Sequence, residues 1–326
     1  MSAPRDAERG SALVTALLIV AVMALVSVGL VDLSMSALQR TGTMDARTQA
    51  AAYLDGAQAF TEAALVRASE LDEGRLRPDG PWDGAPRVFD IEDGRLAGRV
   101  RDASNCLNLN ALHDPDGAPE ADARAADRIR ALFRALGLPA ADGEALIAQG
   151  SDWIDADRAP RPGGAEDDHY LRLPMPHRAA NQPFAEIEEL RALPVMTPDL
   201  FDALRPHLCV LPQPAQPPLN VNTLRLEEAV MLTAMSGGLI TPNEARALIF
   251  RRPSTGYASV EAFWADPSAA PFTDSLPASA VALGSDWFET EITVELDRAR
   301  LTRRQLVRLS GNGEVRRFTP IQGAVL

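Results

Sequence analysis

The chain has 326 residues, of which 46% are hydrophobic and 24% charged, so a disordered or collagen-like protein is excluded. All 32 basic residues are arginines, against 45 acidic residues, and the net charge is −13. The absence of lysine excludes Schiff-base enzymes, P-loop nucleotidases and Ser–Lys nucleophiles. The acidic balance argues against nonspecific nucleic-acid binding, which depends on neutralising phosphates.

The N-terminus carries a short polar segment followed by an apolar one. No charged residue occurs from Gly10 to Val31, a stretch long enough to cross a bilayer as a helix. The junction at Gly10 and Ser11 resembles a type IV prepilin leader, which a prepilin peptidase cuts after Gly on the cytoplasmic face before the new N-terminus is methylated. We therefore predict a leader over 1–10, cleavage between Gly10 and Ser11, and a transmembrane segment over 11–31. An uncleaved signal anchor is the alternative.

The helix continues beyond the membrane segment. No proline occurs between Pro4 and Pro78, and five apolar positions from Ala50 to Ala64 are spaced 3, 4, 3 and 4 residues apart, namely Ala50, Tyr53, Ala57, Phe60 and Ala64. This spacing marks one face of a helix. It predicts a single helix from Ser11 to about Leu71, roughly 90 Å long at 1.5 Å per residue. A membrane anchor with a coiled-coil stalk is disfavoured, because charged flanking positions are scarce.

Alternating strand patterns occur at the two ends of the remaining chain. Residues 87–102 alternate around Asp93-Gly94, which is typical of a β-hairpin. Residues 287–296, 304–310 and 315–319 alternate in the same way, with a turn at 311–313. We expect these strands to form one small antiparallel sheet on the N-terminal helix. The pilin helix and first strands then occupy 32–103, and the last strands occupy 285–326.

The chain between the strands is largely helical and contains an internal repeat. Asn108-Leu-Asn110 recurs 112 residues later as Asn220-Val-Asn222, and helical patterns follow each copy. We therefore predict two helical modules, over 104–215 and 216–284. The second module resembles a helix-hairpin-helix unit of the DNA-uptake type, with Ser236-Gly237-Gly238 at the hairpin. A packing role is favoured over DNA contact, because the chain is acidic and has no lysine.

An acidic loop lies at the end of the first module's second predicted helix. Six carboxylates fall within 17 residues of Gly- and Pro-rich chain, namely Asp152, Asp155, Asp157, Glu166, Asp167 and Asp168. Hard oxygen ligands on a flexible loop suit calcium, although the spacing is not that of an EF-hand. A solvated acidic loop fits the composition equally well.

The only two cysteines, Cys106 and Cys209, flank the first module. Both follow the membrane segment, so they lie in an oxidising compartment if this part of the chain faces the periplasm. We predict a disulfide that closes the base of the module. Two separate buried thiols are the alternative.

Jointly, these features resemble one family, protein K of the type II secretion system, a large minor pseudopilin. The resemblance covers nearly the whole chain, with Thr15 where most pilins carry Glu at the mature fifth position. It rests on the leader Arg9-Gly10 and on Asn108-Leu-Asn110, Asp152-Trp-Ile-Asp155-Ala-Asp157, Gly164-Ala-Glu-Asp167, Ala180-Asn-Gln-Pro-Phe184, Glu189-Leu190 and Leu219-Asn-Val-Asn-Thr223.

The resemblance implies an α+β protein with a pilin-like fold, a long N-terminal helix packed on a small antiparallel sheet. A large helical domain with SAM-like or helix-hairpin-helix-like modules interrupts this fold. It also implies a calcium cofactor, which we expect among Asp155, Asp157, Glu166 and Asp167, with Asp168 less suited.

The resemblance further implies a non-enzymatic, single-pass protein of the bacterial inner membrane, with its C-terminal domain in the periplasm. Its place would be the pseudopilus tip, with minor pseudopilins I and J, other pseudopilins, the inner-membrane secretion platform and the prepilin peptidase as partners, and no nucleic acid. Two rival classes are a membrane-anchored hydrolase that uses the acidic loop and a DNA-uptake pilus component with a helix-hairpin-helix receptor. No nucleophile–His pairing supports the first.

Overall fold

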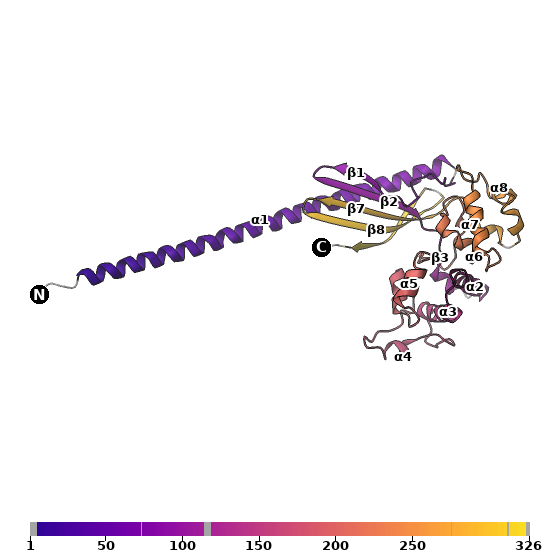
Figure 1. The fold of residues 1–326 in the computed structure, drawn as a ribbon, viewed down its shortest axis with the longest axis horizontal. Helices are drawn as coiled ribbons and strands as arrows, with labels where there is room; N and C mark the ends of the chain where they lie inside the picture. Colours follow the sequence, from indigo (N-terminus) through magenta and orange to yellow (C-terminus); the bar gives the residue numbers. More distant parts are fainter. Residues whose placement is uncertain (1–4, 73, 114–118, 275, 312, 324–326) are drawn as a thin grey trace.

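One long helix projects from a mixed head in the computed structural model, which describes residues 5–72, 74–113, 119–274, 276–311 and 313–323. Figure 1 shows a sheet packed along the C-terminal half of this helix. One group of helices lies at the end of the long helix that is remote from the N-terminus, and a second group lies to the side of this end, below the sheet in this view. The predicted α+β, pilin-like architecture with an inserted helical domain is therefore confirmed.

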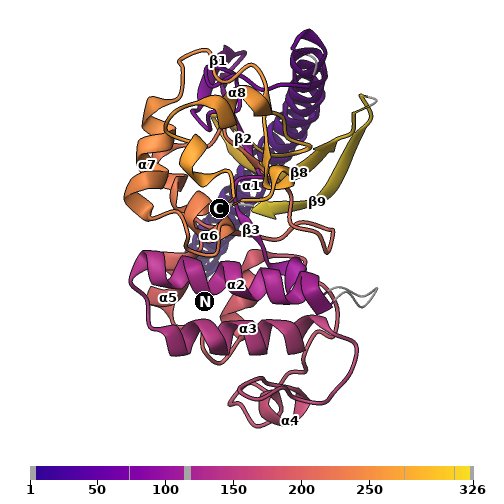
Figure 2. The ribbon, with the colours of Figure 1, turned by 90° about the vertical axis from the view of Figure 1, so that its right-hand side faces the viewer.

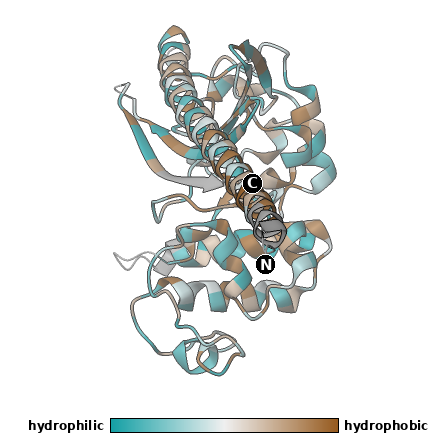
Figure 3. Cartoon of the chain, turned by 90° about the vertical axis from the view of Figure 1, so that its left-hand side faces the viewer, coloured by the Kyte–Doolittle hydropathy of each residue, from teal (hydrophilic) through white to brown (hydrophobic). Residues whose placement is uncertain are grey.

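The long helix is α1 (Arg5–Leu71), which confirms the predicted continuous helix as far as Leu71. Its N-terminal half is apolar and exposed along its described length, and it is long and apolar enough to cross a membrane (Figure 3). The predicted packing face was partly wrong, because Phe60 is 72% exposed. The buried face instead includes Leu54, Gln58, Glu62 and Leu65, and the apolar spacing missed it because two of its members are polar.

Five antiparallel strands form the sheet in the order β1-β2-β7-β8-β9. They are β1 (Arg87–Ile91), β2 (Gly94–Asp102), β7 (Trp287–Leu296), β8 (Ala299–Leu309) and β9 (Val315–Gly323). The hairpin over 87–102 turns at Asp93, which has a φ of 60°. Alternate residues of β7 are buried against α1, as its period-2 pattern predicted: Phe288, Thr290, Ile292 and Val294. The helical insertion thus lies between the paired strands β2 and β7.

The insertion consists of two modules built on one shared hydrophobic core. Helix α2 of the first module packs on α6 of the second, so the modules form a continuous unit (Figure 2). The first contains β3 (Leu107–Asn108), η1 (Leu109–Leu112), α2 (Pro119–Leu136), α3 (Ala140–Ile154), α4 (Asp167–Tyr170), η2 (Ile187–Ala192), α5 (Pro198–Leu204) and β4 (Leu208–Cys209). The second contains β5 (Leu219–Asn220), η3 (Leu226–Glu228), α6 (Val230–Met235), α7 (Pro242–Arg251), α8 (Val260–Ala265), η4 (Ala270–Phe272), η5 (Ala278–Ala280) and β6 (Val281–Ala282).

Each module is closed by the same two devices. A two-residue parallel strand pair joins its ends, β3 with β4 in the first module and β5 with β6 in the second. The second Asn of each Asn-x-Asn motif then binds both backbone polar groups of one distant residue. Asn110 accepts from Phe184 N at 2.8 Å and donates to Phe184 O at 3.0 Å. Asn222 pairs with Tyr257 in the same way, at 2.7 and 3.1 Å.

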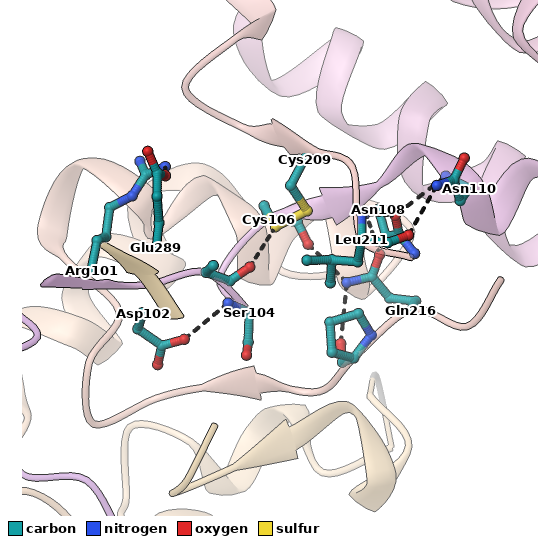
Figure 4. The surroundings of a disulfide bond; sticks show 12 residues. Arg101, Asp102, Ser104, Cys106, Asn108, Asn110, Cys209, Leu211, Gln216 and Glu289 are labelled. Atoms are coloured by element: carbon teal, nitrogen blue, oxygen red, sulfur yellow. Dashed lines mark hydrogen bonds and ion pairs between the residues drawn. A yellow bond between two sulfur atoms is a disulfide. The ribbon is translucent and has the colours of Figure 1, made fainter. Parts of the chain in front are cut away.

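A disulfide between Cys106 and Cys209 confirms the predicted pairing, with their Cα atoms 5.7 Å apart (Figure 4). The bond closes a loop of 103 residues, for which the chain-entropy estimate of stabilisation is about 4–5 kcal/mol. Gln216, where the first module passes into the second, adds hydrogen bonds to the same region. Its amide accepts from Asn108 N and donates to Cys106 O, both at 2.8 Å.

A buried carboxylate lies where the sheet joins both modules. Asp102, the last residue of β2, is 6% exposed, and no cation pairs with it among the described residues. It accepts hydrogen bonds from Ser104 N at 2.9 Å and from the hydroxyls of Thr223 and Ser285, each at 2.5 Å. These donors come from the start of each module and from the return to the sheet. Burial raises the pKa of the Asp102 carboxyl, and the three donors act in the opposite direction.

Candidate metal centre

Three of the predicted carboxylates converge at one end of the first module. Asp155, Asp157 and Glu166 each offer an oxygen, and these oxygens all lie within 4.8 Å of one another. Asp155 is the C-cap of α3 and Glu166 the N-cap of α4, so two helix ends bring the group together. The C-terminal end of a helix carries partial negative charge, and α3 therefore adds to the attraction for a cation here.

Three oxygens of this group, from Asp155 and Glu166, are buried without a partner among the described residues. Asp155 is 4% exposed and Glu166 3% exposed. Asp155 Oδ1 and both carboxylate oxygens of Glu166 have no hydrogen-bond partner among the described residues. Because a buried, unpaired carboxylate is costly, these oxygens fit a bound cation. Asp157 is exposed, and one of its oxygens accepts from Ala159 N at 2.7 Å.

The electrostatics of the metal-free group point the same way. Burial, together with the neighbouring charges of Asp152, Asp155 and Asp157, raises the pKa of the Glu166 carboxyl to about 7. Burial is also the first cause of a raised pKa at Asp152, which is fully buried. The fold therefore concentrates negative charge that nearby protein cations only partly neutralise.

Two predicted ligands lie outside the converging group. Asp167 directs one oxygen to Ala179 N at 3.1 Å and the other to Arg178 at 3.4 Å, so its carboxylate fixes the following loop. Asp168 is exposed on α4. Sequence reasoning missed a cation inside the acidic loop, Arg161, which bonds to both Asp152 and Asp155. The available signal was that Arg161 and Arg158 are the only basic residues in this acidic, Gly- and Pro-rich stretch of sequence.

A tight turn holds this part of the loop against α3. Gly164 N donates to Arg161 O at 2.8 Å across Pro162 and Gly163, and Gly163 has a φ of 82°. Glycine is the residue that adopts this angle without strain. At Gly164 a Cβ atom would lie 1.9 Å from Asp152 Oδ2, so a side chain there would displace the Asp152 carboxylate.

The processing residues lie far from this group. Gly10 and Ser11 belong to α1, and Thr15 is exposed on its apolar half. Residues 1–4 of the predicted leader lie outside the described residues.

In the helix-hairpin-helix segment, the backbone N–H groups of Gly237 and Gly238, which could bind a phosphate, already donate hydrogen bonds within the chain. Gly237 N donates to Ala234 O at 3.0 Å, and Gly238 N donates to Thr233 O at 2.9 Å. Arg134 bonds to Gly237 O at 3.0 Å and fixes the hairpin to the first module. These contacts support a packing role for this segment.

Comparison with known proteins identifies relatives along nearly the whole chain. Two family models described as type II secretion system protein K match residues 105–213 and 219–283. Type II secretion system protein K of Pectobacterium carotovorum is 33% identical over 94% of each chain. The Klebsiella pneumoniae protein is 31% identical over 93% of each, and the Aeromonas hydrophila protein 33% identical over 90% of this chain and 91% of its own.

The fold also matches a solved structure. A chain in the crystal structure of the GspK–GspI–GspJ complex from the enterotoxigenic Escherichia coli type 2 secretion system superposes with a TM-score of 0.76. The two chains are 30% identical, and the match covers 88% of this chain and 100% of the other.

The raised pKa of Glu166 predicts a pH dependence of stability in the metal-free protein. Folded Glu166 keeps its proton up to about pH 7, whereas the unfolded chain releases it near 4.5. The free energy of unfolding should therefore fall as pH rises between these values, by up to about 3 kcal/mol from this group. Glu166→Gln should remove this part of the slope and stabilise the metal-free protein at pH 8.

Urea unfolding in metal-free buffers from pH 4.5 to 8 measures this effect. Glu92→Gln, which neutralises an exposed carboxylate, is the matched control and should keep the wild-type slope. An unchanged slope in Glu166→Gln would contradict the assignment.

Proposed function

Because this chain belongs to the type II secretion system protein K family, we propose that it is the minor pseudopilin of the pseudopilus tip, where it assembles with minor pseudopilins I and J. The observation that carries this proposal is its structural match, over 88% of its length, to a chain in a complex with GspI and GspJ. In this family the pseudopilus drives protein export across the outer membrane, and this subunit would initiate or cap it.

Co-assembly is the direct test of the proposal. The purified full-length chain in detergent is mixed with the I and J proteins of the same bacterium and separated by size. We expect one species that contains all three proteins. Separate elution of this chain from an I–J pair, at concentrations well above those in the membrane, would contradict the proposed partnership.

The placement of the chain in the membrane is part of the same proposal. Residues 11–31 would lie in the inner membrane, after the peptidase has cut between Gly10 and Ser11 and the new N-terminus has been methylated. The head would then face the periplasm. The Cys106–Cys209 disulfide supports this orientation, because disulfides persist in oxidising compartments.

The shape of the head supports a terminal position in the filament. The second module of the insertion lies at the end of α1 that is remote from its N-terminus, and the first module extends sideways from there (Figure 1). A head widened in this way would obstruct a further subunit stacked above it. Thr15 supports it as well. In pilin-like filaments the Glu at this position is thought to neutralise the terminal amine of the subunit above, and a tip subunit has no subunit above it. A neutral hydroxyl avoids an unpaired carboxylate in apolar surroundings.

Thr15→Glu tests the tip position. We expect neutral or weakened secretion and no copies of the variant along the shaft, because the bulk of the head still excludes a subunit above it. Immunogold labelling of overexpressed pseudopili measures the distribution, with Thr15→Ser as the matched control. Labelling of the Thr15→Glu protein throughout the shaft would refute the steric argument.

We also propose that Asp155, Asp157 and Glu166 hold a calcium ion. The support is their convergence, the buried oxygens without partners and the all-oxygen donor set, which is the kind that calcium prefers. A bound calcium ion would supply positive charge that stabilises the loop. Asp155 and Glu166 would fix the loop to the ends of α3 and α4.

Chelation should therefore destabilise the protein at pH 7.5. We expect EDTA to lower the melting temperature by several degrees and excess CaCl₂ to restore it, since a ligand at 100 times its dissociation constant stabilises by about 2.7 kcal/mol. Asp155→Asn should abolish the difference, whereas Glu92→Gln should retain it. Identical melting curves of the wild-type protein with EDTA and with calcium would exclude a stabilising site.

A further inference from the structure

Arg161 occupies a distinctive place beside the three converging carboxylates. Its Nη1 bonds to Asp152 Oδ1 at 3.0 Å and also to Asp155 Oδ2, and its backbone N–H donates to Asp152 Oδ2 at 3.1 Å. Asp152 is fully buried, and it anchors Arg161 to α3. One arginine thus bridges two buried carboxylates while its own side chain is 40% exposed.

We propose that Arg161 is the positioning residue of the cation site, an inference that rests on the proposed calcium site. Arg161 binds one oxygen of Asp155, and the other oxygen, Oδ1, is buried without a partner among the described residues. The guanidinium therefore fixes the rotation of the Asp155 carboxylate and leaves Oδ1 available to the group. Its guanidinium bonds to neither Asp157 nor Glu166. Arg161 therefore orients one ligand, Asp155, without taking the place of the cation.

This arrangement also limits how each carboxylate can bind a metal ion. Asp155 is left with one available oxygen because Arg161 uses the other. Asp157 is restricted in the same way, because one of its oxygens accepts from Ala159 N. Of the three residues, Glu166 is the one with both oxygens lacking a hydrogen-bond partner among the described residues. One two-oxygen ligand with two one-oxygen ligands favours calcium over magnesium, which is smaller and demands near-ideal octahedral geometry.

Charge and position make opposite predictions for loss of Arg161. Removing the positive charge of Arg161 would remove its Coulomb repulsion with a bound cation, and this effect alone would strengthen cation binding. Removing a group that orients a metal ligand typically weakens metal affinity by about 10–100-fold. We expect the second effect to prevail, because Asp155 would lose its fixed orientation and Asp152 would lose its charged partner.

The test is calcium titration calorimetry of the full-length protein in detergent at pH 7.5, after removal of bound metal. Arg161→Gln should weaken Ca²⁺ binding by about 10–100-fold and lower the ratio of Ca²⁺ to Mg²⁺ affinity. Arg161→Lys should restore most of the affinity, because one nitrogen makes both side-chain bonds in the native protein. Arg158→Gln removes the same charge from an exposed position in the same loop and should not weaken binding.

A second pair of variants covers the case in which Arg161→Gln does not fold. Asp152→Asn keeps the shape of the anchor but loosens Arg161, and we expect it to weaken Ca²⁺ binding although Asp152 is not among the three converging residues. Asp168→Asn, an exposed carboxylate on α4, controls for the lost negative charge and should bind as the wild type does.

The outcomes separate the two proposals. If the wild-type protein binds calcium and Arg161→Gln binds as tightly or more tightly, the positioning role is wrong and the calcium site stands. Equal losses in Arg158→Gln and Arg161→Gln, or in Asp168→Asn and Asp152→Asn, would likewise overturn the positioning role. If the wild-type protein does not bind calcium, the site itself fails, and the role of Arg161 fails with it.

Discussion

The architecture depends on one geometric constraint, which is that the chain must leave the sheet and return to it at the same point. Strands β2 and β7 are hydrogen-bonded neighbours, yet about 180 residues lie between them. The Asp102 carboxylate sits at this crossing and accepts from Thr223 and Ser285, as well as from the adjacent backbone. Since an unsatisfied buried carboxylate is costly, the chain reaches a low free energy only when both modules are in place around it. A single buried carboxyl group thereby couples the sheet to both modules.

The same constraint is solved twice more on a smaller scale within the insertion. Each module begins and ends at a parallel strand pair. Each also has an asparagine that hydrogen-bonds to both the N–H and the C=O of a residue far along the chain. A side-chain amide is well suited to this task, because it offers a donor and an acceptor in one plane. The first module encloses the longer loop and carries the disulfide in addition. Closure devices therefore accumulate where the entropy cost of closing the loop is greatest.

Local patterns predicted the elements of this protein well, and long-range chemistry less well. Strand alternation and the proline-free apolar segment found the sheet and α1, because both depend on near neighbours in sequence. The repeat of Asn110 at Asn222 was visible, but the partners Phe184 and Tyr257 lie 74 and 35 residues away. Phe60 was placed on the wrong face of α1, because a polar residue, Gln58, occupies part of the true one.

The candidate site shows the same limit. Its acidic residues were conspicuous in the sequence, but which of them converge depends on how α3 and α4 place their ends. Asp167 and Glu166 are adjacent acidic residues that the sequence alone does not distinguish. In the structure the Asp167 carboxylate faces Ala179 and Arg178 instead of the converging group. The role of Arg161 depends on a turn that brings it back to Asp152, nine residues earlier. The disulfide joins Cys106 and Cys209 at the base of this module. The proposed cation would join the ends of α3 and α4 through Asp155 and Glu166. The disulfide needs an oxidising compartment and the proposed site would need its metal ion, so the full stability of the first module would depend on its surroundings as well as on its apolar core.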